Sequence, residues 1–206
     1  MRNAIGSTGK VCLFVLTLVA PVLAQSWVQS GPAPAATGPD FDVSAGYTSL
    51  TMAMPAAGHA KLGGVDLNGR IDFNPHWGAT VDSNYLRASN VLGTAHDGSV
   101  LILHAGPVFY PVDHGKTRIF LHLLGGVSRV NGALPENKTS YRQGWVVDFS
   151  YAAGGGIERP VSGLFALRVS ADYLRTAFLD STGAVRPQNN LRVTAGLVLH
   201  LNARRP

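Results

Sequence analysis

The chain has little charge, one cysteine and, after residue 24, no long apolar segment. Charged residues make up 14% of it, well below the ~25% of ordinary soluble domains. The single cysteine, Cys12, excludes a disulfide framework and a cysteine metal site. The 17 Lys and Arg exceed the 12 Asp and Glu only mildly, which does not indicate nucleic-acid binding. Intrinsic disorder is excluded by the 46% of apolar residues.

The first residues have the pattern of a cleavable signal peptide. Arg2 and Lys10 precede an apolar stretch over 11–23, and small residues at Val22 and Ala24 predict cleavage before Gln25. The stretch is shorter than the ~20 residues that span a bilayer as a helix. We therefore expect a signal peptide over 1–24, a flexible lead-in over 25–40 that is rich in Pro, Ala, Gly and Ser, and one domain over 41–206.

Beyond the lead-in, the hydropathy has a period of two. In 65–74, odd positions are apolar or Gly and even positions are polar, which predicts a strand with two different faces. Each segment of this kind has ten residues or more, which suits a tilted membrane crossing. The segments are 41–54, 61–74, 77–89, 99–112, 118–130, 145–158, 164–178 and 191–201.

The connections between these segments alternate in length. Short turns follow the second, fourth and sixth segments, and longer polar loops at 131–144 and 179–190 follow the fifth and seventh. This layout is typical of outer-membrane barrels. The sequence therefore predicts an all-β protein, an eight-stranded antiparallel up-and-down transmembrane β-barrel.

If the odd positions face lipid, the even positions place charged side chains in the lumen. A soluble barrel with the two faces exchanged has the same alternation, so the aromatic residues decide between them. They gather at both rims, as membrane interfaces favour. At the ends next to the short turns lie Phe41, Phe73, Trp77, Phe109 and Phe165, and at the opposite ends lie Tyr85, Trp145 and Tyr173. The predicted lumen charges are Asp66, Arg70, Asp72, Asp82, Asp148, Glu158, Arg168, Asp172 and Arg192.

Several short runs resemble the outer-membrane protein β-barrel domain family, the small eight-stranded relatives of the OmpA and OmpX membrane domains, including members from acidobacteria-like genomes. The runs are at 105–110, 120–126, 154–158, 166–168, 172–174, 188–192 and 195–196. The last strand, 194–201, also resembles the C-terminal signal that the barrel-assembly machinery reads, although it ends in Leu201 instead of an aromatic residue. The resemblance implies an outer-membrane location and a barrel but no particular activity.

An eight-stranded barrel is narrow enough to be filled by its own side chains. We therefore expect a structural or surface-interaction protein with a lumen plugged by ion pairs. A narrow, porin-like diffusion channel is the alternative, and a lipid-modifying enzyme is a third. His104 and His122 are the candidates for catalysis, but they fall near mid-strand, away from the outer leaflet. We expect no catalytic residue, metal or cofactor, and we interpret the Gly run at 154–156 as a bulge or sharp bend.

Four cations occupy odd positions close to the outer loops: Lys61, Arg87, Arg129 and Arg175. A charge is tolerated at the rim of a membrane barrel but not at mid-depth. They are interpreted either as contacts to anionic lipid headgroups or as ordinary snorkelling side chains. The expected partners are outer-membrane lipids, of which lipopolysaccharide is one candidate, and the assembly machinery. We expect no nucleic acid and a monomer.

Overall fold

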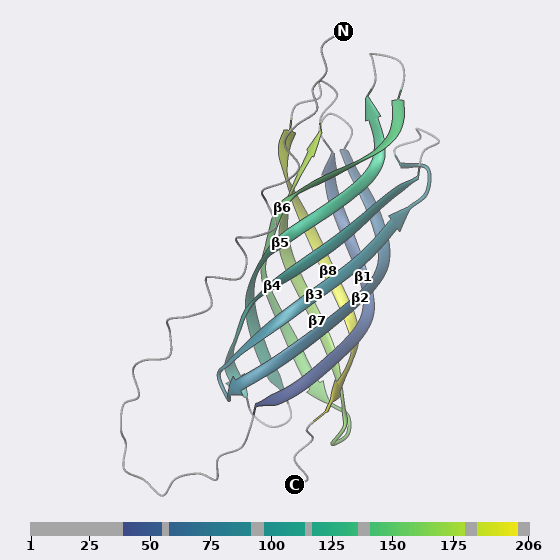
Figure 1. The fold of residues 1–206 in the computed structure, drawn as a ribbon. Coiled ribbons are helices and arrows are strands. Elements are labelled where there is room, and N and C mark those ends of the chain that lie inside the picture. The colour runs from purple at the N-terminus through teal and green to yellow at the C-terminus, as the bar shows by residue number, and fades with distance from the viewer. Residues whose placement is uncertain are drawn as a thin grey trace, which may run out of the picture. The chain divides into compact units, whose positions relative to one another are not determined.

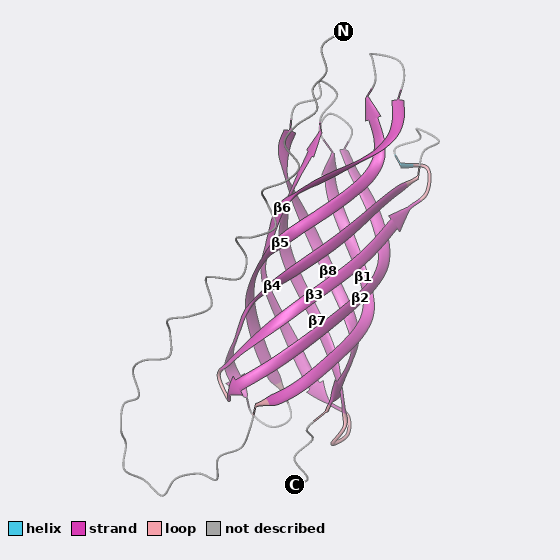
Figure 2. Cartoon of the chain, viewed as in Figure 1, coloured by secondary structure: helices cyan, strands magenta, loops and turns pink. Residues whose placement is uncertain are grey.

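The computed structural model describes residues 39–54, 58–91, 97–113, 117–135, 141–179 and 185–201. The predicted signal peptide and nearly all of the lead-in lie outside these residues. The described part is built almost entirely of strands (Figure 2). They are β1 (Asp40–Met54), β2 (Gly58–Asn74), β3 (Trp77–Ala88), β4 (Gly98–Asp113), β5 (Arg118–Pro135), β6 (Tyr141–Pro160), β7 (Phe165–Leu179) and β8 (Val185–His200).

The eight strands form a closed antiparallel barrel in chain order, and all of them are tilted relative to the barrel axis (Figure 1). Each strand pairs with the next one, and β8 closes the ring against β1, for example at Tyr47 and Ala195. Closure leaves no unpaired sheet edge. The fold predicted from the alternation is therefore confirmed.

The two faces of every strand follow the parity of the residue number. In β3 the burial alternates along the whole strand, so that Asp82 and Asn84 are buried while Val81 and Tyr85 are exposed. The other strands keep the same parity, with even positions facing the lumen and odd positions facing outward. Parity carries over from strand to strand because paired residues have the same parity, except at the register shifts beside the β2–β3 and β4–β5 turns.

We call the end with the β2–β3, β4–β5 and β6–β7 connections the turn end, and the opposite end the loop end. The β2–β3 turn is held by Asn74, whose Oδ1 accepts hydrogen bonds from the backbone N–H groups of His76 and Trp77, both at 2.9 Å. In the β6–β7 turn, Ser162 Oγ accepts from the N–H of Phe165 at 3.1 Å. Side-chain acceptors of this kind satisfy the backbone of a short turn.

The strands extend further at the loop end than the sequence predicts. The two loops expected at 131–144 and 179–190 are largely strand, because β5 runs to Pro135, β6 begins at Tyr141 and β8 begins at Val185. On β8 the burial alternation continues into this segment, since Gln188 and Asn190 are buried, but both side chains are polar and the hydropathy therefore does not alternate.

The glycine run in β6 is not a bulge, contrary to the expectation. Gly154 pairs with His122 and Gly156 with Phe120 in an unbroken register. The register shifts lie instead between Asp72 and Asn74 and between Phe109 and Val112.

Candidate functional site

Near the turn end, Arg70 on β2 is the centre of a group of ion pairs. Its guanidinium pairs with Asp42 on β1 and with Glu158 on β6. Its Nε also lies 3.5 Å from Asp72 Oδ1. In the ring of eight strands, β6 is diametrically opposite β2. The pair with Glu158 therefore crosses the full width of the lumen.

A second arginine adds to this turn-end cluster from β5. Arg118 Nη1 lies 2.8 Å from Asp72 Oδ2, and its guanidinium carbon lies 3.5 Å from the centre of the Tyr110 ring. The Tyr110 hydroxyl donates to Asp72 Oδ1 at 3.0 Å. One carboxylate thus receives donors from two further strands, as a buried charge requires.

The central cluster is organised by Arg192 on β8, one of the largest fully buried side chains. Its Nη1 lies 2.5 Å from Asp82 Oδ2 on β3, and its Nη2 lies 2.7 Å from Asp172 Oδ2 on β7. His122 Nε2 lies 2.7 Å from the other oxygen of Asp172. A planar guanidinium can bind two carboxylates at once, and here it ties β3 to β8 across the barrel.

Arg168 on β7 adds a further arginine beside the turn-end cluster. Its Nη1 lies 3.6 Å from Glu158 Oε1 and donates to Asn68 Oδ1 at 3.2 Å, while its guanidinium lies 4.2 Å from the Phe120 ring centre. Two predicted lumen residues make no ion pair within the described residues. Asp66 lies beside Asp82, and half-buried Asp148 accepts from the N–H of Phe149 at 2.7 Å.

Four members of these clusters are absent from the residues predicted to carry the lumen charge. Asp42, Tyr110, Arg118 and His200 all have even numbers and are buried or half-buried. His200 Nδ1 lies 2.7 Å from Asp42 Oδ1. The parity of the strands was the signal that could have found them, since it continues to the strand ends.

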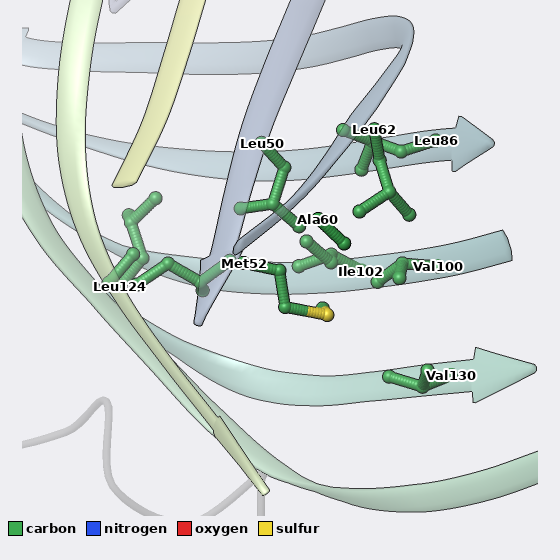
Figure 3. Close-up of a cluster of buried hydrophobic side chains, with 11 residues drawn as sticks. Leu50, Met52, Ala60, Leu62, Leu86, Val100, Ile102, Leu124 and Val130 are labelled. Carbon is green, nitrogen blue, oxygen red and sulfur yellow. The ribbon is translucent and has the colours of Figure 1, made fainter. Parts of the chain in front are cut away.

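Toward the loop end the lumen contains a large apolar layer, which the sequence did not predict, beside buried polar side chains such as Asn84 and Asn190. Side chains from seven strands pack together there with almost no exposure, and nine of them are labelled in Figure 3. Ala88 and Val91, which follow along β3 and into the next loop, pack against this apolar layer. The layer consists of Leu50, Met52, Ala60, Leu62, Leu86, Val100, Ile102, Leu124, Val130, Ala152 and Leu174.

The two histidines considered for catalysis are both buried in the lumen. His104 Nε2 lies 2.8 Å from Ser150 Oγ on β6, and His122 lies against Asp172. The His104–Ser150 pair joins residues 46 apart in the sequence, so a search for a local motif could not find it. Ser150 is completely buried, whereas a nucleophile needs a route for its substrate.

The glycines of β6 make room for these buried groups. A Cβ at Gly154 would lie 2.3 Å from Asp172 Oδ1, and one at Gly156 would lie 2.7 Å from Phe120 Cζ. Neither distance is possible for a real side chain, so these positions have to be glycine for Asp172 and Phe120 to lie where they do.

The outward-facing cations and aromatic residues lie close to the two rims. Lys61, Arg87 and Arg129 are exposed and Arg175 is half-buried. Arg129 lies 4.9 Å from the centre of the Trp145 ring, which makes a cation–π contact near the loop end. At the turn end, the rings of Trp77 and Phe109 pack in a tilted arrangement with their centres 4.8 Å apart.

Comparisons with known proteins identify the fold. No protein-family model and no curated protein matches the chain. Among solved structures, Neisserial surface protein A is similar with a TM-score of 0.63 at 12% identity, over 79% of this chain and 99% of that one. The attachment invasion locus protein Ail of Yersinia pestis has a TM-score of 0.55 at 18% identity over the same shares.

OprG, an outer-membrane protein of Pseudomonas aeruginosa, is also similar, with a TM-score of 0.52 at 10% identity over 81% of this chain and 97% of that one. Within the described residues, no helix is both long and apolar enough to cross a membrane. The eight strands close into a barrel with the parity and connections described above. The chain therefore has the fold of the small eight-stranded bacterial outer-membrane β-barrels.

Proposed function

We propose that this chain is a bacterial outer-membrane protein with a structural or surface-interaction role, whose lumen is plugged by its own side chains. The observation that carries the proposal is the ion pair of Arg70 with Glu158, which joins opposite walls of the barrel. The wall exposes apolar side chains such as Leu67 and Leu103 to the outside, where lipid would surround them.

Two consecutive barriers support the plugged lumen. The charged clusters fill the section near the turn end, and the apolar layer fills the section near the loop end. An ion that passed through would have to displace buried ion pairs and then leave most of its water at a section lined largely by buried apolar side chains. Each of these steps is expensive for a charge.

The alternative is a narrow, porin-like diffusion channel, in which the ion pairs open and close. Channel conductance distinguishes the two functions. The third candidate, a lipid-modifying enzyme, is disfavoured because the His104–Ser150 pair is buried inside the barrel, away from a lipid ester at its surface. We accordingly assign no catalytic role to either histidine.

The surface-interaction part of the proposal rests on the loop end. There β5 and β6 continue as a hairpin, pairing from Asn131–Trp145 to Pro135–Tyr141. Among the proteins of similar fold, one is named a surface protein and another an attachment invasion locus protein. We propose the same kind of setting for this chain, as a monomer inserted by the barrel-assembly machinery.

Fractionation and gel migration test the proposal. The protein should sediment with the outer membrane after cleavage of its signal peptide. On a detergent gel, the folded barrel should migrate differently before and after boiling. Recovery of the protein from the periplasm in soluble form would contradict the membrane location, because a soluble barrel cannot leave its odd-numbered apolar residues in water.

A further inference from the structure

On the outward face of β2, near the loop end, the side chain of Tyr47 covers the backbone of Gly63. A Cβ there would lie 2.1 Å from the Tyr47 hydroxyl oxygen and 3.1 Å from Tyr47 Cζ. The tip of the Tyr47 side chain therefore lies directly on the Gly63 backbone. Because Tyr47 pairs with Val65 in the register, its side chain leans along β2 toward the loop end to reach this position.

Three further donor groups surround Gly63 on the same face. Its register partners are Ser49 on β1 and Arg87 on β3. Lys61 precedes it by two residues on β2 and so projects from the same face. Opposed side chains on neighbouring strands begin ~4.5–5.5 Å apart. The phenol of Tyr47 thus lies beside the positions from which a hydroxyl, an ammonium and a guanidinium group project.

The charge of this area is uncompensated. Within the described residues, neither Lys61 nor Arg87 has a carboxylate within 4 Å, although Arg70, Arg168 and Arg192 in the lumen all do. Both cations are exposed on the outside of the barrel. A pair of cations without an anion indicates that the anion comes from outside the chain.

The surroundings indicate what kind of anion this is. On the turn side of Gly63, the same face continues with Val65 and Leu67, which are 57% and 56% exposed. An anion bound at Gly63 would have water on the loop side and this apolar wall on the other. A phosphate attached to acyl chains matches both environments, whereas a free anion gains nothing from the apolar wall.

We propose that Tyr47, Ser49, Lys61 and Arg87 form a binding site for the phosphate of an anionic lipid headgroup, with the Tyr47 hydroxyl, seated over Gly63, at its centre. The proposal rests on the membrane location proposed above and adds a defined ligand class and position to it. Charge-assisted hydrogen bonds to phosphate oxygens supply the affinity. Because Gly63 has no side chain, the Tyr47 hydroxyl occupies the place of one, next to the positions of Lys61 and Arg87.

The test is a titration of the refolded full-length barrel in detergent micelles, followed by native mass spectrometry. The probe is diphosphorylated lipid A, with dephosphorylated lipid A as the matched lipid. The double variant Lys61→Gln/Arg87→Gln should bind the diphosphorylated form about thirtyfold more weakly, since each of the two basic residues near an anionic surface contributes about 1 kcal/mol. Arg159→Gln, which removes an exposed cation near the turn end, should bind like the wild type.

Two further variants locate the site. Tyr47→Phe removes only the hydroxyl and should weaken binding by a few-fold. Arg129→Gln/Arg175→Gln should lose less than the Lys61/Arg87 pair. Equal losses for the two pairs, or unchanged binding in Lys61→Gln/Arg87→Gln, would overturn the site at Gly63.

A competition experiment with inorganic phosphate shows whether the site prefers a lipid-linked phosphate to a free anion. Inorganic phosphate should not displace the bound lipid A. Displacement would overturn the assignment to a headgroup. The migration shift of each variant on a detergent gel reports folding independently of lipid binding. If Lys61→Gln/Arg87→Gln keeps the migration shift and binds lipid A like the wild type, only this site is rejected and the proposed barrel function is retained.

Discussion

Arg70 and Glu158 form an ion pair between β2 and β6, two strands that lie opposite each other and never pair through their backbones. Side chains thus join strands that the hydrogen-bond ladder leaves far apart. Arg192 does the same between β8 and β3. The lumen is therefore part of what fixes the cross-section of the barrel.

Loss of the central arginine should destabilise the barrel strongly. Arg192→Met leaves Asp82 and Asp172 as buried carboxylates without their shared partner. Breaking a buried pair in this way costs about 3–5 kcal/mol. Denaturant unfolding in lipid vesicles, followed by tryptophan fluorescence, measures the change. If Arg192→Met unfolds at the wild-type midpoint, the central cluster does not stabilise the barrel.

The triple variant Arg192→Met/Asp82→Leu/Asp172→Leu is its matched control. Replacing all charged partners by apolar groups removes the unpaired charge, so much of the lost stability should return.

Glycine 154 should not tolerate even one added methyl group. A Cβ would lie 2.3 Å from Asp172 Oδ1 and 2.4 Å from the Ala171 carbonyl oxygen. Gly154→Ala should therefore lower the free energy of unfolding by about 1–3 kcal/mol, as overpacking typically does. At Gly69 no atom lies within 4 Å of the added Cβ, so Gly69→Ala should be close to neutral. Equal effects of the two substitutions in the same unfolding assay would contradict this explanation of the glycine run.

The apolar layer should contribute to stability as a packed core does. Ile102 is fully buried in it, whereas its neighbour Leu103 is 50% exposed on the outside. Ile102→Ala should cost about 2–5 kcal/mol through lost contacts and the resulting cavity. Leu103→Ala should cost clearly less, because lipid chains can fill the space. The unfolding midpoints of the two variants decide between a packed and a loosely filled lumen.

The aromatic residues at the two rims should lie at the membrane interfaces. Trp77 near the turn end and Trp145 near the loop end are 50% and 59% exposed. In variants that retain one of these tryptophans, lipids brominated close to the headgroup should quench the fluorescence more than lipids brominated at the chain end. Stronger quenching by the deep bromines would place these side chains in the hydrocarbon interior and refute the rim assignment.

The sequence was sufficient for the fold because the lumen and the exterior differ in polarity at most positions. The alternation at 65–74 sets the parity of β2, and register partners of equal parity transmit it around the barrel. The alternation did not predict the apolar layer, because both faces of the strands are apolar there. The even position Ile102 does not differ in hydropathy from the odd positions beside it.

The partners of the buried charges could not be predicted either. That Arg70 contacts Glu158, 88 residues away, depends on the stagger of all the strands between them. Ser150 was missed for the same reason, since its contact with His104 crosses the lumen. The site around Gly63 depends on how the Tyr47 side chain leans, which no sequence pattern encodes.

Single-channel recording in planar lipid bilayers tests the plugged lumen most directly. The refolded full-length protein should insert without producing conductance steps, because the ion pairs and the apolar layer both close the path. Proteoliposomes carrying the same preparation should contain the heat-modifiable, folded species, so that silence reflects a closed barrel. Steady, reproducible steps from the folded protein would contradict the plug and support the diffusion channel instead.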